Sequence, residues 1–296
     1  WKVQAAQEHD YAVPRWYQAV TLFEREVMDT TKDSEKIWGG LMLKLGVGLV
    51  TGVVWLNQFG DKQDDIFPST GALFLCCMTS VLDTTMATVL KFPVTRALLR
   101  REYRNGVYSL PAFYTATLLA FTMWQAFFSL FLAVPVWFLV GFPLSLTKFL
   151  TFLALIALLC CVGSTLGLAV GTLMDDVSKV QQAIMPIFIP QVLFSGYVLP
   201  FQNMSQWQKV IYFISFFQYA LSSLEIIVFH DHKFNDCDAS LDYGSLVCYE
   251  TGDDYLDDNH IEAKDLPRNF FILLAWFGLF AIGGYYLAKM MLRGTL

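Results

Sequence analysis

The sequence predicts an all-α polytopic membrane protein, with six transmembrane helices, an N-terminal amphipathic connecting helix and a large external loop that contains a re-entrant helical segment. Three observations support this fold class. Of the 296 residues, 55% are hydrophobic and 16% are charged, whereas soluble domains usually have about 25% charged residues. The apolar residues form unbroken runs, unlike the short alternating segments of a membrane barrel. These runs reach the roughly 20 residues that a helix needs to cross a hydrocarbon core about 30 Å thick.

The first 36 residues are predicted to form a cytoplasmic linker and the amphipathic connecting helix. Trp16, Val20, Phe23 and Val27 follow one another at spacings of three and four, which places them on one face of a helix. We expect this helix to lie along the inner membrane surface with that face buried. Packing on another soluble domain is equally compatible with the pattern. The chain starts at Trp1 without a signal-peptide pattern, so we expect it to be part of a longer polypeptide.

Residues 37–296 are predicted to form the transmembrane domain. Between its second and third spans lies the segment 91–108, KFPVTRALLRREYRNGVY, which has five basic side chains and one acid. Short basic loops are normally retained in the cytoplasm, so this segment sets the orientation of the whole chain. A solvated loop against the lipid headgroups, with no further role, is the simple alternative. The six spans are expected at about 37–57, 69–90, 111–140, 147–173, 180–199 and 269–291.

The fourth span has a glycine at every fourth position, namely Gly163, Gly167 and Gly171. Small residues at this spacing form a face that another helix backbone can approach closely. We expect this face to pack within the bundle, and an oligomer contact is the alternative. The fifth span contains Pro186 and Pro190. They predict a kink, which a membrane helix tolerates because its neighbours can satisfy the freed carbonyls.

Residues 207–229 are apolar enough to cross the membrane, but we interpret them as re-entrant. Four polar side chains make this stretch a poor lipid-exposed helix: Gln218, Ser222, Ser223 and Glu225. Cys237 and Cys248 are the only cysteines outside apolar runs, and a disulfide in a loop requires the oxidising side of the membrane. We therefore expect residues 200–268 to form the external loop.

Two charged residues, Lys44 and Asp83, lie well inside predicted spans, away from the span ends. An ionisable group inside a membrane is a functional hypothesis by default. Each lies about seven residues from the inner end of its span, or roughly 10 Å deep at 1.5 Å per residue. The two side chains could therefore form an intramembrane ion pair. The alternative is that Lys44 extends to the inner headgroups while Asp83 faces a wet cavity.

Motifs for enzyme chemistry are missing from the sequence. It contains no GxxxxGK[ST] phosphate loop, no HExxH motif and no paired CxxC pattern. We therefore predict no catalytic residue and no metal site in this chain. The HDH sequence at 230–232 could chelate a metal, but a solvated loop is the favoured interpretation.

The order of these features resembles the transmembrane domain of the ABC transporter G subfamily, the White or pleiotropic-drug-resistance type, which has the ABC-2 type exporter fold. The family's first inner loop typically reads REY-x-x-G-x-Y, which is matched by Arg101, Glu102, Tyr103, Gly106 and Tyr108. Its FSG sequence near the outer end of span five is matched by Phe194, Ser195 and Gly196. The resemblance covers residues 14 to 291, nearly the whole chain.

The resemblance implies the membrane half of an ATP-driven exporter that moves lipids, sterols or amphipathic xenobiotics by alternating access. It implies a homodimer, or a heterodimer with another half-transporter, in contact with membrane lipids and with no nucleic acid. ATP and Mg would bind to a nucleotide-binding domain, which is absent from this chain. The plasma membrane is the expected location, and an organelle membrane is the alternative. A non-transporting membrane scaffold or partner subunit without its own ATPase is the alternative, while a secondary carrier would be expected to show inverted repeats.

The resemblance also implies roles for particular residues. Segment 91–108 would hold the coupling helix that contacts the nucleotide-binding domain, through Arg96, Arg100, Arg101, Glu102, Tyr103 and Arg104. The substrate path would be lined from spans two and five by Thr79, Leu82, Asp83, Ile189 and Val192, although an acid is unusual in a path for apolar cargo. The outer gate, often a leucine pair after FSG in the family, would be formed here by Tyr197 and Val198.

Two features of the outer loop complete these expectations. The external cysteines resemble the family's intramolecular disulfide, which implies a bridge between Cys237 and Cys248. Asn203 begins an Asn-Met-Ser glycosylation sequon.

Overall fold

The computed structural model describes residues 13–173, 177–235 and 248–293. Five of its helices contain apolar stretches long enough to cross a membrane: α2 (Ser34–Val54), α3 (Ile66–Arg104), α4 (Leu110–Val140), α5 (Leu146–Gly171) and α10 (Leu266–Arg293). The other α-helices described are α1 (Arg15–Lys32), α6 (Val177–Leu193), α7 (Gln206–Ile214), α8 (Phe216–Phe229) and α9 (Gly252–Asp258). Three single turns of 3-10 helix are η1 (Gln63–Asp65), η2 (Phe201–Asn203) and η3 (Ala263–Asp265). The predicted all-α, multi-pass membrane architecture is confirmed.

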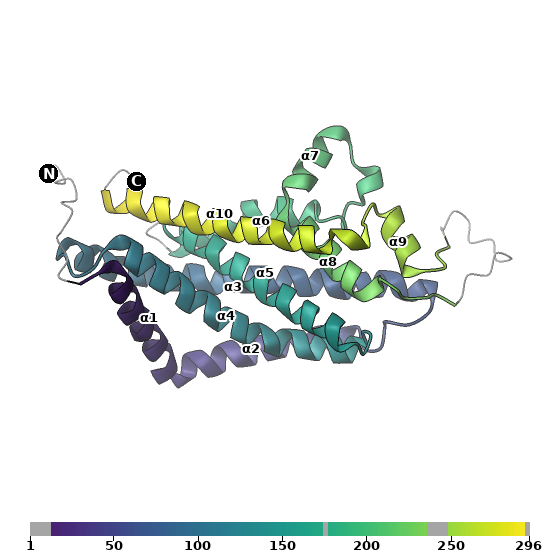
Figure 1. Cartoon of the computed structure of the whole chain (residues 1–296), viewed down its shortest axis with the longest axis horizontal. Coiled ribbons are helices and arrows are strands. Elements are labelled where there is room, and N and C mark those ends of the chain that lie inside the picture. Colours follow the sequence, from purple (N-terminus) through teal and green to yellow (C-terminus); the bar gives the residue numbers. More distant parts are fainter. Residues whose placement is uncertain (1–12, 174–176, 236–247, 294–296) are drawn as a thin grey trace.

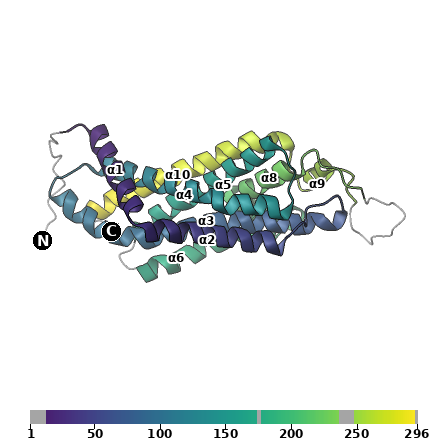
Figure 2. The same cartoon turned by 90° about the horizontal axis from the view of Figure 1, so that it is seen from below.

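The long helices run lengthwise through one elongated bundle, with α1 at one end and α9 at the opposite end (Figures 1 and 2). The positive-inside rule assigns the α1 end, where the basic end of α3 also lies, to the cytoplasm. We call this the inner end and the α9 end the outer end. The main apolar core lies between α3, α4, α5 and α8, and its largest fully buried side chains include Trp137, Phe152 and Phe217.

Helices α3 and α5 pack backbone to backbone along the predicted glycine face. A Cβ atom added at Gly163 would lie 2.2 Å from Thr84 Oγ1 and 2.7 Å from the carbonyl oxygen of Val81. One added at Gly167 would lie 2.6 Å from the carbonyl oxygen of Thr85. No real Cβ fits at such distances, so these two glycines allow the contact. The interpretation of this face as packing within the bundle is confirmed at Gly163 and Gly167.

The basic segment 91–108, predicted as an inner loop that holds a coupling helix, is mostly helix and continues α3, so only its last residues form a loop. Helix α3 continues without interruption to Arg104, and only residues 105–109 connect it to α4. Its 39 residues correspond to about 58 Å at 1.5 Å per residue, well beyond a hydrocarbon core of about 30 Å. Arginine and lysine are good helix formers and suit the negative end of a helix dipole, so the basic residues extend the helix into water.

Helix α6 is shorter than the predicted fifth span at 180–199. It has 17 residues, or about 26 Å, with Pro186 and Pro190 inside it. The chain leaves the helix after Leu193 and turns at Gly196, where φ is +100°. This left-handed conformation favours glycine, so the FSG sequence ends the span early.

Helices α7 and α8 are bent by 77° relative to each other, and both ends of the pair lie at the outer end of the bundle. Before α7, Gln202 Nε2 donates to the carbonyl oxygen of Asp258 at 2.9 Å. After α8, a ring nitrogen of His232 lies 3.1 Å from the carbonyl oxygen of Gly60. The bend itself lies on α6, where Ser215 Oγ donates to the carbonyl oxygen of Gln191 at 3.2 Å. The pair therefore enters and leaves on one side, as the re-entrant interpretation predicts.

Helix α1 packs against α4 through Leu22 and the partly buried Phe23. Of the apolar face predicted from spacing, Trp16 is 69% exposed and Val20 is 48% exposed. Val20 lies at the edge of the α1–α4 contact, where it lines a shallow pocket with Leu119 and Met123 of α4. This arrangement leaves an apolar strip that is free to contact lipid at the inner membrane surface.

Candidate functional site

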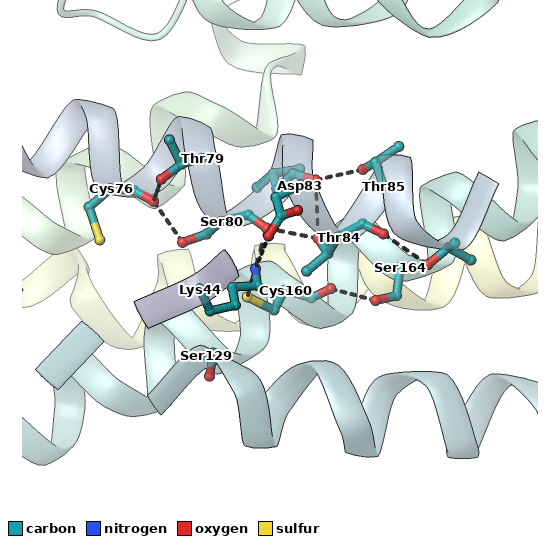
Figure 3. A network of polar contacts seen from close by, with 12 residues as sticks. Lys44, Cys76, Thr79, Ser80, Asp83, Thr84, Thr85, Ser129, Cys160 and Ser164 are labelled. Carbon is teal, nitrogen blue, oxygen red and sulfur yellow. Dashed lines mark hydrogen bonds and ion pairs between the residues drawn. The ribbon is translucent and has the colours of Figure 1, made fainter. Parts of the chain in front are cut away.

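An ion pair joins α2 to α3 inside the membrane (Figure 3). Lys44 Nζ lies 2.8 Å from Asp83 Oδ2 and 4.0 Å from Cys160 Sγ of α5. The lysine side chain is 3% exposed and the aspartate side chain is 24% exposed. Removal of one member of a buried pair leaves an uncompensated charge, which typically costs about 3–5 kcal/mol. The pair therefore connects three helices in the inner half of the bundle.

The hydroxyl groups beside the ion pair are bonded mainly to their own helix. Ser80 Oγ donates to the carbonyl oxygen of Cys76 at 2.6 Å, and Thr84 Oγ1 donates to that of Ser80 at 2.8 Å. Thr85 Oγ1 also reaches across to the carbonyl oxygen of Gly163 at 3.0 Å. Such local bonds satisfy polar groups where no water is available. This polar face of α3 is therefore a packing surface.

A cavity of about 220 Å³ lies beside the ion pair. Lys44 and Asp83 line it together with the aromatic side chains of Phe121 and Trp124 from α4. Among the described residues, Trp124 Nε1 is buried without a hydrogen-bond partner. Asp83 thus forms the predicted ion pair with Lys44. It also lines a cavity, which was part of the alternative interpretation.

The residues assigned to a substrate path do not gather around one of the described cavities. Asp83 faces Lys44, and Thr79 Oγ1 donates to the carbonyl oxygen of Leu75 in its own helix at 2.8 Å. Leu82 and Val192 are half-buried against the main core, and Ile189 is 55% exposed. A path lined by them would need a surface from outside this chain.

The inner end is held together by contacts between α1, the end of α3 and the start of α4. Arg25 Nη1 lies 3.4 Å from Glu102 Oε2, and its guanidinium lies 6.0 Å from the ring centroid of Tyr108. The backbone N–H of Ser109 donates to Gln18 Oε1 at 2.9 Å. We call these five residues the inner junction. The acid of the basic segment is therefore paired within the chain.

The other residues assigned to coupling differ in exposure. Arg101 and Arg104 are exposed in the last turn of α3, whereas Arg96 is 4% exposed and Arg100 is half-buried. Tyr103 packs against the smaller core between α1, α4 and α10. Arg101 and Arg104 are therefore the members of this set best placed to meet another domain.

The outer end contains a larger cavity, of about 330 Å³. Its walls come from η1 and the start of α3, the turn after α6, the α7–α8 pair and the α9 region. Tyr197, assigned to the outer gate, lines it and stacks on Phe74 and Phe67, with centroid distances of 4.7 and 5.6 Å. Val198 is 48% exposed and is not among the lining residues. The two assigned gate residues thus have different surroundings.

A small polar cluster lies where α8 meets α9. His230 Nδ1 is 2.7 Å from Asp253 Oδ1, and His230 Nε2 is 3.5 Å from Asp231 Oδ2. The ligand atoms of the three residues lie within 4.8 Å of one another. Asp231 is 77% exposed at its side chain. The cluster is a solvated hydrogen-bonded group at the end of α8, and a metal site is not assigned.

The ABC-2 type transporter family matches residues 17–229, which is more than half of the chain. The chain belongs to this family. Its relatives include ABC transporter G family member 4 of Arabidopsis thaliana, which is 27% identical over 243 residues, or 82% of this chain and 42% of that protein. Protein white of Ceratitis capitata is 24% identical over 292 residues, or 97% of this chain and 42% of that protein. ABC multidrug transporter H of Aspergillus fumigatus is 28% identical over 254 residues, or 78% of this chain and 18% of that protein.

These relatives confirm the predicted resemblance to the G subfamily. The chain spans less than half the length of each of the three relatives. The chain is an integral, multi-pass ABC-2 membrane domain.

Two predictions for the outer loop of this ABC-2 domain stay untested. Cys237 lies outside the described residues, so its disulfide with Cys248 remains a prediction; Cys248 lines the outer cavity. Asn203 is the last residue of η2, and its glycosylation also remains a prediction. The serine of that sequon, Ser205, caps α7 and donates its hydroxyl to Gln208 Oε1 at 2.6 Å.

Sequence reasoning did not assign a role to two residues of this ABC-2 domain that line the outer cavity, Ser195 and Glu225. Ser195 belongs to the FSG sequence, and Glu225 is one of the polar side chains that interrupt the apolar stretch 207–229. A lone acid in an apolar helix was the available signal for Glu225. The cavity itself could not be foreseen because five separate segments form it.

Proposed function

We propose that this ABC-2 domain is the membrane half of an ATP-driven exporter that works as a dimer and moves lipids, sterols or amphipathic xenobiotics out of the cytoplasmic leaflet by alternating access. The observation that carries the proposal is helix α3. Its first turns line the outer cavity through Ile66, Phe67 and Thr70, and its last turn presents Arg101 and Arg104 beyond the inner membrane surface. One helix thus connects a cavity on the outer side with a charged surface on the inner side.

Coupling to ATP hydrolysis would act through this inner end. Glu102 is held by Arg25, so a force on the end of α3 also reaches α1. Exposed arginines suit paired hydrogen bonds with carboxylates of another domain. ATP and Mg²⁺ would be bound by that nucleotide-binding domain, which supplies the energy of transport.

The exposed apolar surface of α6 and α3 supports the proposed cargo class. Ile189, Met185 and Leu193 of α6 and Leu90 of α3 are each more than 40% exposed in a single copy of the chain. A second half-transporter that covers these side chains would enclose a mostly apolar path, which suits lipids and amphipathic molecules. We expect the complete protein in the plasma membrane.

The test uses the full-length protein reconstituted in liposomes, with ATP hydrolysis and the export of a fluorescent lipid analogue measured together. The double change Arg101→Glu and Arg104→Glu should lower both rates at least tenfold while the protein keeps its melting temperature. The matched control is Lys264→Glu with Arg268→Glu, two exposed basic residues at the outer end, which should leave both rates within twofold. Equal rates in both double variants would refute the coupling role. Absence of ATP-dependent export in the unaltered protein would favour the scaffold alternative.

A further inference from the structure

The outer cavity contains two buried polar side chains that have no hydrogen-bond partner within the part of the chain that the structure describes. Glu225 is 5% exposed and Ser195 is 2% exposed, and both line the cavity. Among the described residues, Ser195 Oγ has no hydrogen-bond partner, and no hydrogen bond or ion pair reaches the Glu225 carboxylate. Burial of a carboxylate without a partner is costly, and it raises the pKa of Glu225 to about 8. A cationic ligand in the cavity would supply the missing interaction and favour the ionised carboxylate.

The surroundings of Glu225 favour a positive ligand. No lysine or arginine is present among the described residues that line the cavity, while a second acid, Asp64, lines it from an exposed position. Tyr197, Tyr212 and Tyr255 contribute aromatic rings. The faces of such rings attract cations, with a strength that rises where water is excluded.

An organic cation fits these walls better than a metal ion. Hard metal ions such as Ca²⁺ take six to eight oxygen ligands, whereas this cavity has two carboxylates and mostly apolar or aromatic walls. A protonated amine needs one carboxylate and acceptors for its N–H groups. Glu225 can supply the charge, and Ser195 Oγ can accept a hydrogen bond.

We propose that the outer cavity is a binding site for the protonated amine group of an organic molecule, with Glu225 as the counter-charge, Ser195 as a hydrogen-bond acceptor and the tyrosine rings as the walls. This inference deepens the proposed function, because it names a class of molecule that the exporter would hold on its outer side. The inference rests on the proposed exporter function only for the direction in which the amine would be transported. Binding itself requires no ATP.

The test measures binding without ATP, by calorimetric titration of the full-length protein in lipid nanodiscs at pH 7. The probes are 2-phenylethylamine, which is protonated at this pH, and its neutral analogue 2-phenylethanol. The unaltered protein should bind the amine at least tenfold more tightly than the alcohol. Glu225→Gln should reduce that preference below threefold. The matched control, Glu250→Gln, removes an exposed glutamate of the same external region and should keep the preference.

A second variant separates the roles of charge and hydrogen bonding. Ser195→Ala should weaken binding of the amine a few-fold and leave the binding of its trimethylammonium derivative unchanged, because that derivative has no N–H to donate. If Glu225→Gln does not fold, the proposal is tested by the amine preference of the unaltered protein and by the amine affinity of Ser195→Ala. Equal binding of amine and alcohol, no amine binding up to millimolar concentration, or an undiminished preference in Glu225→Gln would each overturn the proposal. Export is measured separately with ATP, so a failure of transport is distinguishable from a failure of binding.

Discussion

Two acidic residues lie inside the helical bundle, Asp83 in its inner half and Glu225 at its outer end. Each lines a cavity, but of the two only Asp83 has a cationic partner among the described residues. Asp83 is 2.8 Å from a lysine amine, beside the glycine-lined contact of α3 with α5. Glu225 faces a cavity of about 330 Å³ and has no cationic partner among the described residues. The paired charge of Asp83 links two helices, whereas the carboxylate of Glu225 could be compensated by a bound cationic ligand. The inner half is therefore built for rigidity and the outer end for binding.

The largest expected effect tests the paired charge. Asp83→Asn should lower the free energy of unfolding by about 3–5 kcal/mol, because it leaves Lys44 buried and unpaired. The double change Lys44→Met with Asp83→Leu should recover most of that loss. Thermal unfolding of the protein in nanodiscs measures both. Equal losses in the single and double variants would show that the pair does not act as a unit.

The next effect tests the rigidity of the inner half. Gly163→Ala should cost about 1–3 kcal/mol of stability, because the new Cβ would meet a backbone carbonyl at 2.7 Å. The control is Gly278→Ala in α10, where an added Cβ has no neighbour within 4 Å. A melting temperature for Gly163→Ala as high as that of the control would contradict the close α3–α5 contact.

A smaller effect is expected at the unpaired charge. Glu225→Gln should leave the free energy of unfolding within about 1 kcal/mol of the unaltered value, or raise it, because an amide is less costly to bury than a carboxylate without a partner. The same thermal measurement applies. A loss as large as that of Asp83→Asn would show that Glu225 has a structural role, and the contrast between the two sites would fail.

The smallest effect concerns a third acid, Asp254, which is solvated and also hydrogen-bonded. Hydrogen bonds from the Thr251 side chain and backbone lower the pKa of Asp254 below its ordinary value of 3.8. Because the folded value is depressed, the contribution to stability is present above that ordinary value and is lost as pH falls through the folded pKa. The protection factor for amide hydrogen exchange in the first turn of α9, which corrects for the intrinsic pH dependence of exchange, should therefore fall on acidification below about pH 4. In Asp254→Asn this fall should be absent.

The sequence predicted those structural features that depend on one local pattern of residues. Span length and apolar composition predicted the membrane helices, and the four-residue glycine spacing predicted a close packing face, though not its partner α3. Equal depth made the pairing of Lys44 with Asp83 one of two alternatives. The continuation of α3 into the basic segment could not be predicted, because charge alone cannot distinguish a separate loop from a helix that projects into water. The outer cavity could not be predicted from the sequence, because its walls come from segments up to about 200 residues apart. Only folding brings Asp64 and Tyr255 to the same cavity.

The length of α3 has a mechanical consequence. Its 39 residues form a rod of about 58 Å, and a rod of that length that tilts by about 5° moves one end by about 5 Å relative to the other. The backbone contact with α5 at Gly163 and Gly167 lies part-way along it and would serve as a fulcrum. A small displacement of Arg104 on the inner side would thus be delivered, with opposite sign, to Phe67 and Thr70 in the wall of the outer cavity.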